Sequence, residues 1–146
     1  MENNASFESP GTIFKRLHEA YNRHDHAQAA ALYAIDGEHE DIALSHVARG
    51  RDAVAAGLAH FFTAFPDAHW HALDDLETTD RAMGRYVLTA TLQRDMGNLK
   101  AAGQRLQLRG VHILETAQGL IQRSEDFWDS KTFHNQMNTM NTGAKA

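Results

Sequence analysis

The chain has 146 residues, 42% of them hydrophobic, which is the length and the apolar content of one domain with one core. Its formal charge of −5 comes without a run of lysine or arginine, which argues against a nucleic-acid partner and against docking on an anionic membrane. It contains no cysteine, which excludes disulfides and thiolate chemistry, and no apolar run approaches the roughly 18 residues of a membrane span. The first residues are polar and acidic, so we expect no secretory signal and a cytoplasmic protein.

An antiparallel pair of helices is predicted at the start of the chain. Ser9 and Pro10 offer a helix cap and a first-turn proline, and apolar residues then recur on one helical face as far as Tyr21. Asp25 can cap a second, shorter helix over residues 26–34, whose alanine-rich face allows close packing against the first.

The apolar period changes from helical to alternating along the rest of the chain. One or two short strands are predicted between Glu38 and Ala48, and a third helix over residues 51–65. From residue 68 to 129 apolar residues alternate with polar ones, which predicts four long strands in meander order. A short helix is predicted near residues 131–137.

Helices followed by an antiparallel sheet predict the α+β class, in which a curved sheet covers its inner face with the helices. A strongly curled sheet of this kind encloses a cavity. We expect one domain over residues 1–146 with a core at about 10–138, and flexible tails at 1–8 and 139–146.

The last predicted hairpin decides which side chains share a face of the sheet. A three-residue loop ending at Gly119 suits a turn closed by a left-handed glycine, and it pairs Thr116 with Leu120. The following pairs are then His112 with Ser124, Gly110 with Asp126, and Leu108 with Trp128, all on one face. A two-residue loop would instead put His112 and Asp126 on opposite faces.

Asp126 is the predicted acid or base. Leu108, Leu114 and Trp128 on the same face would desolvate its carboxylate and raise its pKa toward neutrality. Gly110 leaves room for a ligand atom, and His112 can donate a hydrogen bond to a ligand oxygen that gains charge. The alternative is that Asp126 and His112 lie at a wet sheet edge or only satisfy each other.

Other polar clusters give weaker signals. His69 and His71 share a strand face and with His39 could ligate a metal, but half-exposed strand positions explain them as well, and we predict no metal. Asp129 is expected to cap the terminal helix. There is no glycine-rich dinucleotide fingerprint and no phosphate loop, so we predict no cofactor.

Several short motifs together resemble the SnoaL-like polyketide cyclase family, within the nuclear transport factor two-like superfamily that includes ketosteroid isomerase. The resemblance covers roughly residues 12–138, and it is carried by the segments Ala20-Tyr21-Asn22, Gly50, Phe65-Pro66-Asp67, Val111-His112-Ile113, Gly119-Leu120-Ile121, Trp128-Asp129 and Gln136-Met137. It implies a cone-shaped α+β fold, with a curved, mostly antiparallel sheet wrapped around three N-terminal helices. It also implies that Asp126 is the acid-base residue and that His112 lines the pocket.

The resemblance implies a cofactor-free ring closure of the aldol type, or a related isomerisation, on a small apolar carbonyl or polyketide-like compound. Asp126 would remove a proton from carbon between carbonyls and return one to the aldol oxygen, and His112 would steady the enolate. Alternatives are a binding or dimerising module, and a dehydratase, epoxide hydrolase or cofactor-free oxygenase. We expect a homodimer or higher homo-oligomer. The predicted pocket residues are Trp128, Leu108, Gly110, Leu114, His39, Trp70 and Phe62.

Overall fold

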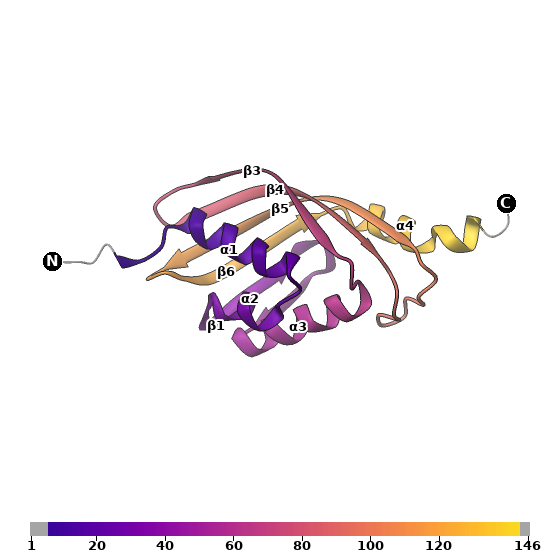
Figure 1. Cartoon of the computed structure of the whole chain (residues 1–146), viewed down its shortest axis with the longest axis horizontal. Helices are drawn as coiled ribbons and strands as arrows, with labels where there is room; N and C mark the ends of the chain where they lie inside the picture. Colours follow the sequence, from indigo (N-terminus) through magenta and orange to yellow (C-terminus); the bar gives the residue numbers. More distant parts are fainter. Residues whose placement is uncertain (1–5, 144–146) are drawn as a thin grey trace.

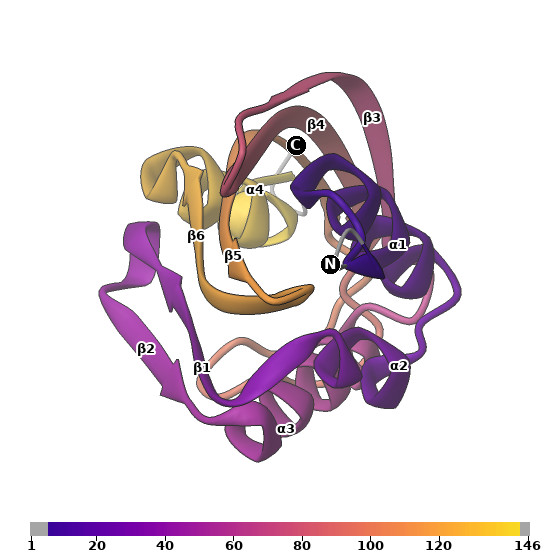
Figure 2. The same ribbon diagram turned by 90° about the vertical axis from the view of Figure 1, so that its left-hand side faces the viewer.

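A six-stranded mixed sheet curls around three helices, which lie on its concave side (Figures 1 and 2). The computed structural model describes the backbone of residues 6–143 and the side chains of residues 6–138, so the outermost parts of both predicted tails, residues 1–5 and 144–146, lie outside it. The helices are α1 Pro10–Asn22, α2 His26–Ala31, α3 Arg51–Ala64 and α4 Ser130–Gly143, with a short 3-10 turn, η2, at Ile42–Leu44. The strands are β1 Tyr33–Asp41, β2 His46–Arg49, β3 His69–Glu77, β4 Arg81–Thr91, β5 Arg105–Ala117 and β6 Leu120–Trp128.

The first two helices begin where their capping residues predict. The Ser9 hydroxyl accepts a hydrogen bond from the Thr12 backbone N–H at 3.2 Å, and the Asp25 carboxylate accepts one from Gln28 N–H at 3.0 Å. Helix α2 ends at Ala31, before the predicted end, because Tyr33 already pairs with β6 and the chain must be extended there.

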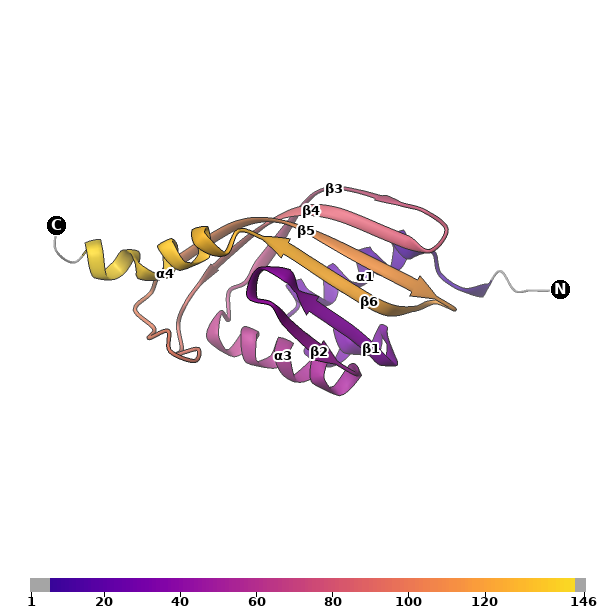
Figure 3. The ribbon, with the colours of Figure 1, turned by 180° about the vertical axis from the view of Figure 1, so that it is seen from behind.

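The sheet has the strand order β2-β1-β6-β5-β4-β3 and is not closed into a barrel. The predicted meander of four strands is confirmed, since β3, β4, β5 and β6 are antiparallel neighbours in sequence order. Strand β1 runs parallel to β6, whereas β2 pairs antiparallel with β1 at the edge, as seen from behind in Figure 3. The α+β class and the cone-like wrapping of the sheet around the helices agree with the sequence prediction.

The predicted register of the last hairpin is wrong. The loop has two residues, Gln118 and Gly119, with φ of 54° and 76°, a pair of left-handed conformations that matches the twist of the strands. A bulge in β6 then shifts the pairing by one more residue, so His112 lies directly opposite Asp126. The two-residue loop alone would have separated these residues onto opposite faces, and the bulge returns them to the same one.

The C-terminal helix α4 packs beside β5 and is longer than predicted. Asp129 caps it, accepting hydrogen bonds from Lys131 N–H and the Thr132 hydroxyl at 3.1 and 2.7 Å. The Gln136 amide exchanges two hydrogen bonds with the backbone of Gln107, at 2.7 and 3.0 Å. No helix in the described part of the chain has the length and apolar content to span a membrane.

Helix α1 sits so close to the sheet that one strand position requires glycine. A Cβ atom at Gly84 would lie 2.6 Å from the buried ring of Phe14 and 3.1 Å from the Asp74 carbonyl oxygen. Gly57, in α3, has open space around its missing side chain.

We therefore expect opposite effects from two glycine-to-alanine changes. Gly84→Ala should lower the free energy of unfolding by about 1–3 kcal/mol through overpacking. Gly57→Ala should raise it by about 0.5–1 kcal/mol, because alanine is the better helix former. Urea unfolding of both variants checks this, and an unchanged midpoint for Gly84→Ala would contradict the packing of α1.

Candidate active site

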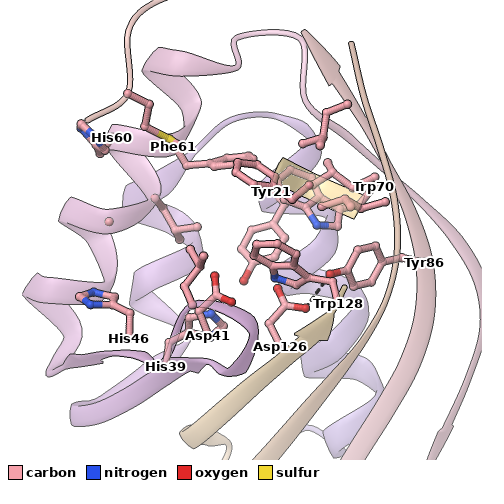
Figure 4. A pocket seen from close by; sticks show the side chains of 18 residues that line it. Tyr21, His39, Asp41, His46, His60, Phe61, Trp70, Tyr86, Asp126 and Trp128 are labelled. Carbon is pink, nitrogen blue, oxygen red and sulfur yellow. Dashed lines mark hydrogen bonds between the residues drawn. The ribbon is translucent and has the colours of Figure 1, made fainter. Parts of the chain in front are cut away.

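A cavity of about 300 Å³ lies between helix α3, the concave face of the sheet and the start of α4 (Figure 4). Its aromatic walls are formed by Tyr21, Phe61, Trp70, Tyr86, Trp128 and Phe133. Aliphatic side chains complete them, namely Leu44, Leu58, Leu88, Met96, Leu106 and Leu108. A cavity of this size and lining suits a small, flat, apolar molecule.

Asp126, on β6, places its carboxyl group in this cavity. The Tyr86 hydroxyl donates a hydrogen bond to its Oδ1 at 2.6 Å. Burial raises the pKa of Asp126 to about 7, and the charge of Asp41 adds to the rise, whereas the hydrogen bond from Tyr86 opposes it. Burial, together with the charge of Asp126, raises the pKa of Tyr86, so this phenol stays a donor. A carboxyl that titrates near neutrality is suited to proton transfer.

Asp41, the last residue of β1, is a second carboxyl in the same cavity. It is the register partner of Asp126 across the parallel strands, and its Oδ1 is buried without a hydrogen-bond partner in the described part of the chain. Burial raises the pKa of Asp41 to about 6, against the opposing effects of the Leu44 backbone N–H, the charge of His46 and the Trp128 indole. Sequence reasoning missed Asp41, although its position two residues after His39 on one strand was a usable signal.

Three hydrogen-bonded side chains, those of Tyr33, Ser124 and His39, lead from the core to the cavity that His39 lines. The Ser124 hydroxyl joins the Tyr33 hydroxyl and His39 Nδ1, each at 2.6 Å. Burial raises the pKa of Tyr33 to about 12. Burial, and to a smaller extent the charge of His46, lowers the pKa of His39 to about 4. The cavity therefore holds a neutral imidazole beside its two carboxyl groups.

Five of the residues expected in the pocket or at its catalytic centre line the cavity: Asp126, Trp128, Leu108, Trp70 and His39. Four others, His112, Gly110, Leu114 and Phe62, lie outside this lining. Gly110 is covered by Tyr86, whose hydroxyl and ring would collide with an added Cβ, so the tyrosine and not a ligand fills the space at this glycine. In α3 it is Phe61, the neighbour of Phe62, that reaches the cavity.

His112 is buried under helix α1 instead of facing a ligand. Its Nδ1 lies 3.0 Å from His18 Nε2, and Phe14 and Tyr21 pack around the two rings. The other ring nitrogens, His18 Nδ1 and His112 Nε2, are buried without a partner in the described part of the chain. Burial, with the adjacent His18 and His39, lowers the pKa of His112 well below its usual range. Each ring is thus neutral.

The alternative metal site of the three strand histidines does not assemble. His69 and His71 are exposed on β3, and Trp70 between them points into the cavity that His39 lines. Within the described residues, no three histidine, aspartate or glutamate side chains are grouped so that they could hold a metal ion.

The buried imidazoles predict an acid-sensitive contribution to stability. Burial lowers the pKa of His18 and of His39 from 6.5 to about 4, so the unfolded chain takes up these protons first as the pH falls. The stability that they contribute is complete above pH 6.5 and is lost as the pH falls toward 4. NMR titration of the imidazole C–H signals should give midpoints near 4 for both residues. Midpoints near 6.5 would show that these rings are solvated.

The raised pKa of Asp126 predicts the opposite pH dependence. Its contribution to stability is complete below the usual pKa of 3.8 and is lost as the pH rises through about 7, because the unfolded chain ionises first. The asparagine of Asp126→Asn cannot ionise. The free energy of unfolding of this variant, minus that of the wild type, should therefore increase by roughly 2–4 kcal/mol between pH 4 and 8. Urea unfolding at both pH values measures this. Asp36→Asn, an equal charge change at an exposed position of β1, is the control and should show no such growth.

Comparison with known proteins identifies the family. The sequence model described as SnoaL-like polyketide cyclase matches residues 12–137. No curated protein matches the chain. A solved structure of a candidate polyketide cyclase from Pseudomonas putida has 17% identity, covers 88% of this chain and 98% of its own, and gives a TM-score of 0.82. A second candidate cyclase, from Xanthomonas campestris pv. campestris, has 21% identity, coverages of 88% and 96%, and a TM-score of 0.80.

A protein with a ketosteroid isomerase-like fold from Catenulispora acidiphila, solved in complex with trimethylamine, has 16% identity, coverages of 90% and 95%, and a TM-score of 0.77. At these identities the likeness to the solved structures establishes the fold alone. The family is established by the sequence model of the family, which matches most of the chain. The chain belongs to the SnoaL-like polyketide cyclase family.

Proposed function

We propose that this protein is a cofactor-independent acid-base enzyme, which promotes ring closure of the aldol type or a related isomerisation of a small apolar carbonyl compound. Membership in the family and the cone fold support a cyclase-like or isomerase-like function in general. The observation that carries the proposal is the carboxyl of Asp126, which faces an aromatic cavity, receives a hydrogen bond from Tyr86 and has its pKa raised to about 7.

The chemistry follows from where the carboxyl lies. A carbon between carbonyl groups is acidic enough for a carboxylate to take its proton, and desolvation strengthens that base. The aromatic walls can hold a flat substrate against Asp126, which would exchange protons with it. General acid-base catalysis of this kind contributes about 10²–10⁴-fold to a rate.

The residues that line the cavity help to decide between the alternative functions. A second carboxyl is present, as an epoxide hydrolase would require, but no arginine or lysine lines the cavity within the described residues. A binding-only role is the second candidate, because the relative of this fold from Catenulispora acidiphila forms a complex with trimethylamine. The two roles differ in whether a bound carbonyl compound exchanges its protons.

The test is exchange of carbon-bound protons in 2-tetralone, a flat bicyclic ketone. In D₂O the wild type should accelerate loss of the NMR signal of the methylene between the carbonyl and the ring. Asp126→Asn should reduce that acceleration by about 10²-fold or more. Asp36→Asn should retain it. Binding of the ketone without exchange would favour the binding module, and exchange that survives in Asp126→Asn would contradict the proposed role of Asp126.

A further inference from the structure

Two carboxyl groups share the polar end of the cavity. Asp41 and Asp126 are register partners on the parallel strands β1 and β6, and both line the cavity. Figure 4 shows the two carboxyl groups turned into the same space, below the rings of Tyr21 and Trp70. Only one of them belongs to the acid-base site predicted from the sequence.

The charged and titratable neighbours provide little compensation for a second negative charge. Within the described residues, the cavity lining contains three histidines, His39, His46 and His60, and no lysine or arginine. His39 is neutral, because burial lowers its pKa to about 4. Tyr21 and Tyr86 are neutral donors, since burial raises the pKa of each phenol. Two ionised carboxylates in this setting would repel each other with little screening, so the pair retains one proton near neutrality.

The neighbours also indicate which carboxyl keeps the proton. The ionised form of Asp41 is favoured by the backbone N–H groups of Leu44 and Ala43, by the Trp128 indole and by the charge of His46. Among the residues that the structure describes, the Tyr86 hydroxyl alone favours the ionised form of Asp126. These contacts favour a resting pair in which Asp126 is protonated and Asp41 is ionised.

We propose that Asp41 is the second catalytic carboxyl of this site, and that it removes the carbon-bound proton of the substrate while Asp126 donates its own proton to the carbonyl oxygen. The inference rests on the proposed function and divides the acid and base roles within it. Asp41 is only half-buried and lines the cavity, so its carboxyl group can meet the carbon-bound proton of a bound substrate.

The proton count balances through the reaction. The C–H bond breaks toward Asp41, its electron pair forms the C=C bond of the enol, and the carbonyl π pair takes the proton from Asp126. The pair is then a protonated Asp41 beside an ionised Asp126, with its total charge unchanged. When the enol carbon attacks a second carbonyl, Asp41 gives its proton to the new alkoxide and Asp126 recovers the enol proton, which restores the starting state.

Proton sharing is tested without any substrate. Carboxyl NMR titrations of protein with ¹³C-labelled aspartate would compare the wild type with Asp41→Asn and Asp126→Asn. In Asp41→Asn the pKa of Asp126 should fall by at least about one unit, because the charge of Asp41 is gone. In Asp126→Asn the pKa of Asp41 should change little, because Asp126 is still protonated when Asp41 ionises. Asp36→Asn should leave both titrations unchanged. Independent titration of the two carboxyls would overturn the pairing, whatever the protein catalyses.

The division of roles is tested with two reactions that differ in their need for an acid. Kemp elimination of 5-nitrobenzisoxazole needs a base only, because the C–H proton leaves as the N–O bond breaks to a nitrile and a stabilised phenolate. Proton exchange of 2-tetralone needs a base and benefits from an acid at the carbonyl oxygen. Asp41→Asn should lower both rates by about 10²-fold or more, whereas Asp126→Asn should lower ketone exchange at least tenfold more than Kemp elimination.

The outcomes separate this inference from the proposed function. If the wild type accelerates neither reaction, the proposed function fails, and the NMR titrations still decide whether the carboxyls share a proton. If ketone exchange depends on Asp126 but survives in Asp41→Asn, the proposed function stands and the role of Asp41 is overturned. Thermal unfolding of each variant shows whether a lost rate reflects lost folding.

Discussion

The parallel pairing of β1 with β6 is the contact on which the site depends. It joins the strand that follows the first two helices to the last strand of the meander, and so brings Asp41 beside Asp126. The pairing includes an irregularity between Tyr33 and Glu38, where Gly37 approaches the Ile121 carbonyl so closely that a Cβ would lie 2.7 Å from it. Beyond this point β1 turns polar residues into the cavity. The same pairing therefore completes the sheet and assembles the acidic end of the cavity.

Two carboxyl groups in an apolar cavity lower the stability of the fold, and packing elsewhere must compensate for this loss. Desolvation raises the pKa of both carboxyl groups, so at neutral pH they lower the free energy of unfolding. The core beneath α1 supplies compensation through close packing, in which Phe14 lies against Gly84 and two neutral histidines stack among aromatic rings. Of the three buried side-chain atoms without a hydrogen-bond partner in the described residues, Asp41 Oδ1 belongs to the site, whereas His18 Nδ1 and His112 Nε2 lie in the core beneath α1.

Glycine and histidine on β5 have structural roles that resemble functional ones in the sequence. Gly110 lies opposite Tyr86, and the missing side chain is what lets the phenol lie over the strand and reach Asp126. His112 points to the same side of the sheet but lies under α1, where it meets His18. The groups that act on Asp126 directly are thus Tyr86 and Asp41, which come from the strands on the two sides of the hairpin.

The helix starts, the α+β class and the meander could be predicted from the sequence, because caps and apolar periodicity act over a few neighbouring residues. It also pointed to Asp126 and to four of the other residues that line the cavity, namely Trp128, Leu108, Trp70 and His39. The prediction that His112 and Asp126 share a face held although its register was wrong, since a shorter loop and a bulge offset each other. Three features could not be predicted in this way: the pairing of Asp41 with Asp126, the position of Tyr86 over Gly110 and the burial of His112. These depend on contacts between segments far apart in the chain, where a single residue of register or one covering helix changes which side chain a carboxyl meets.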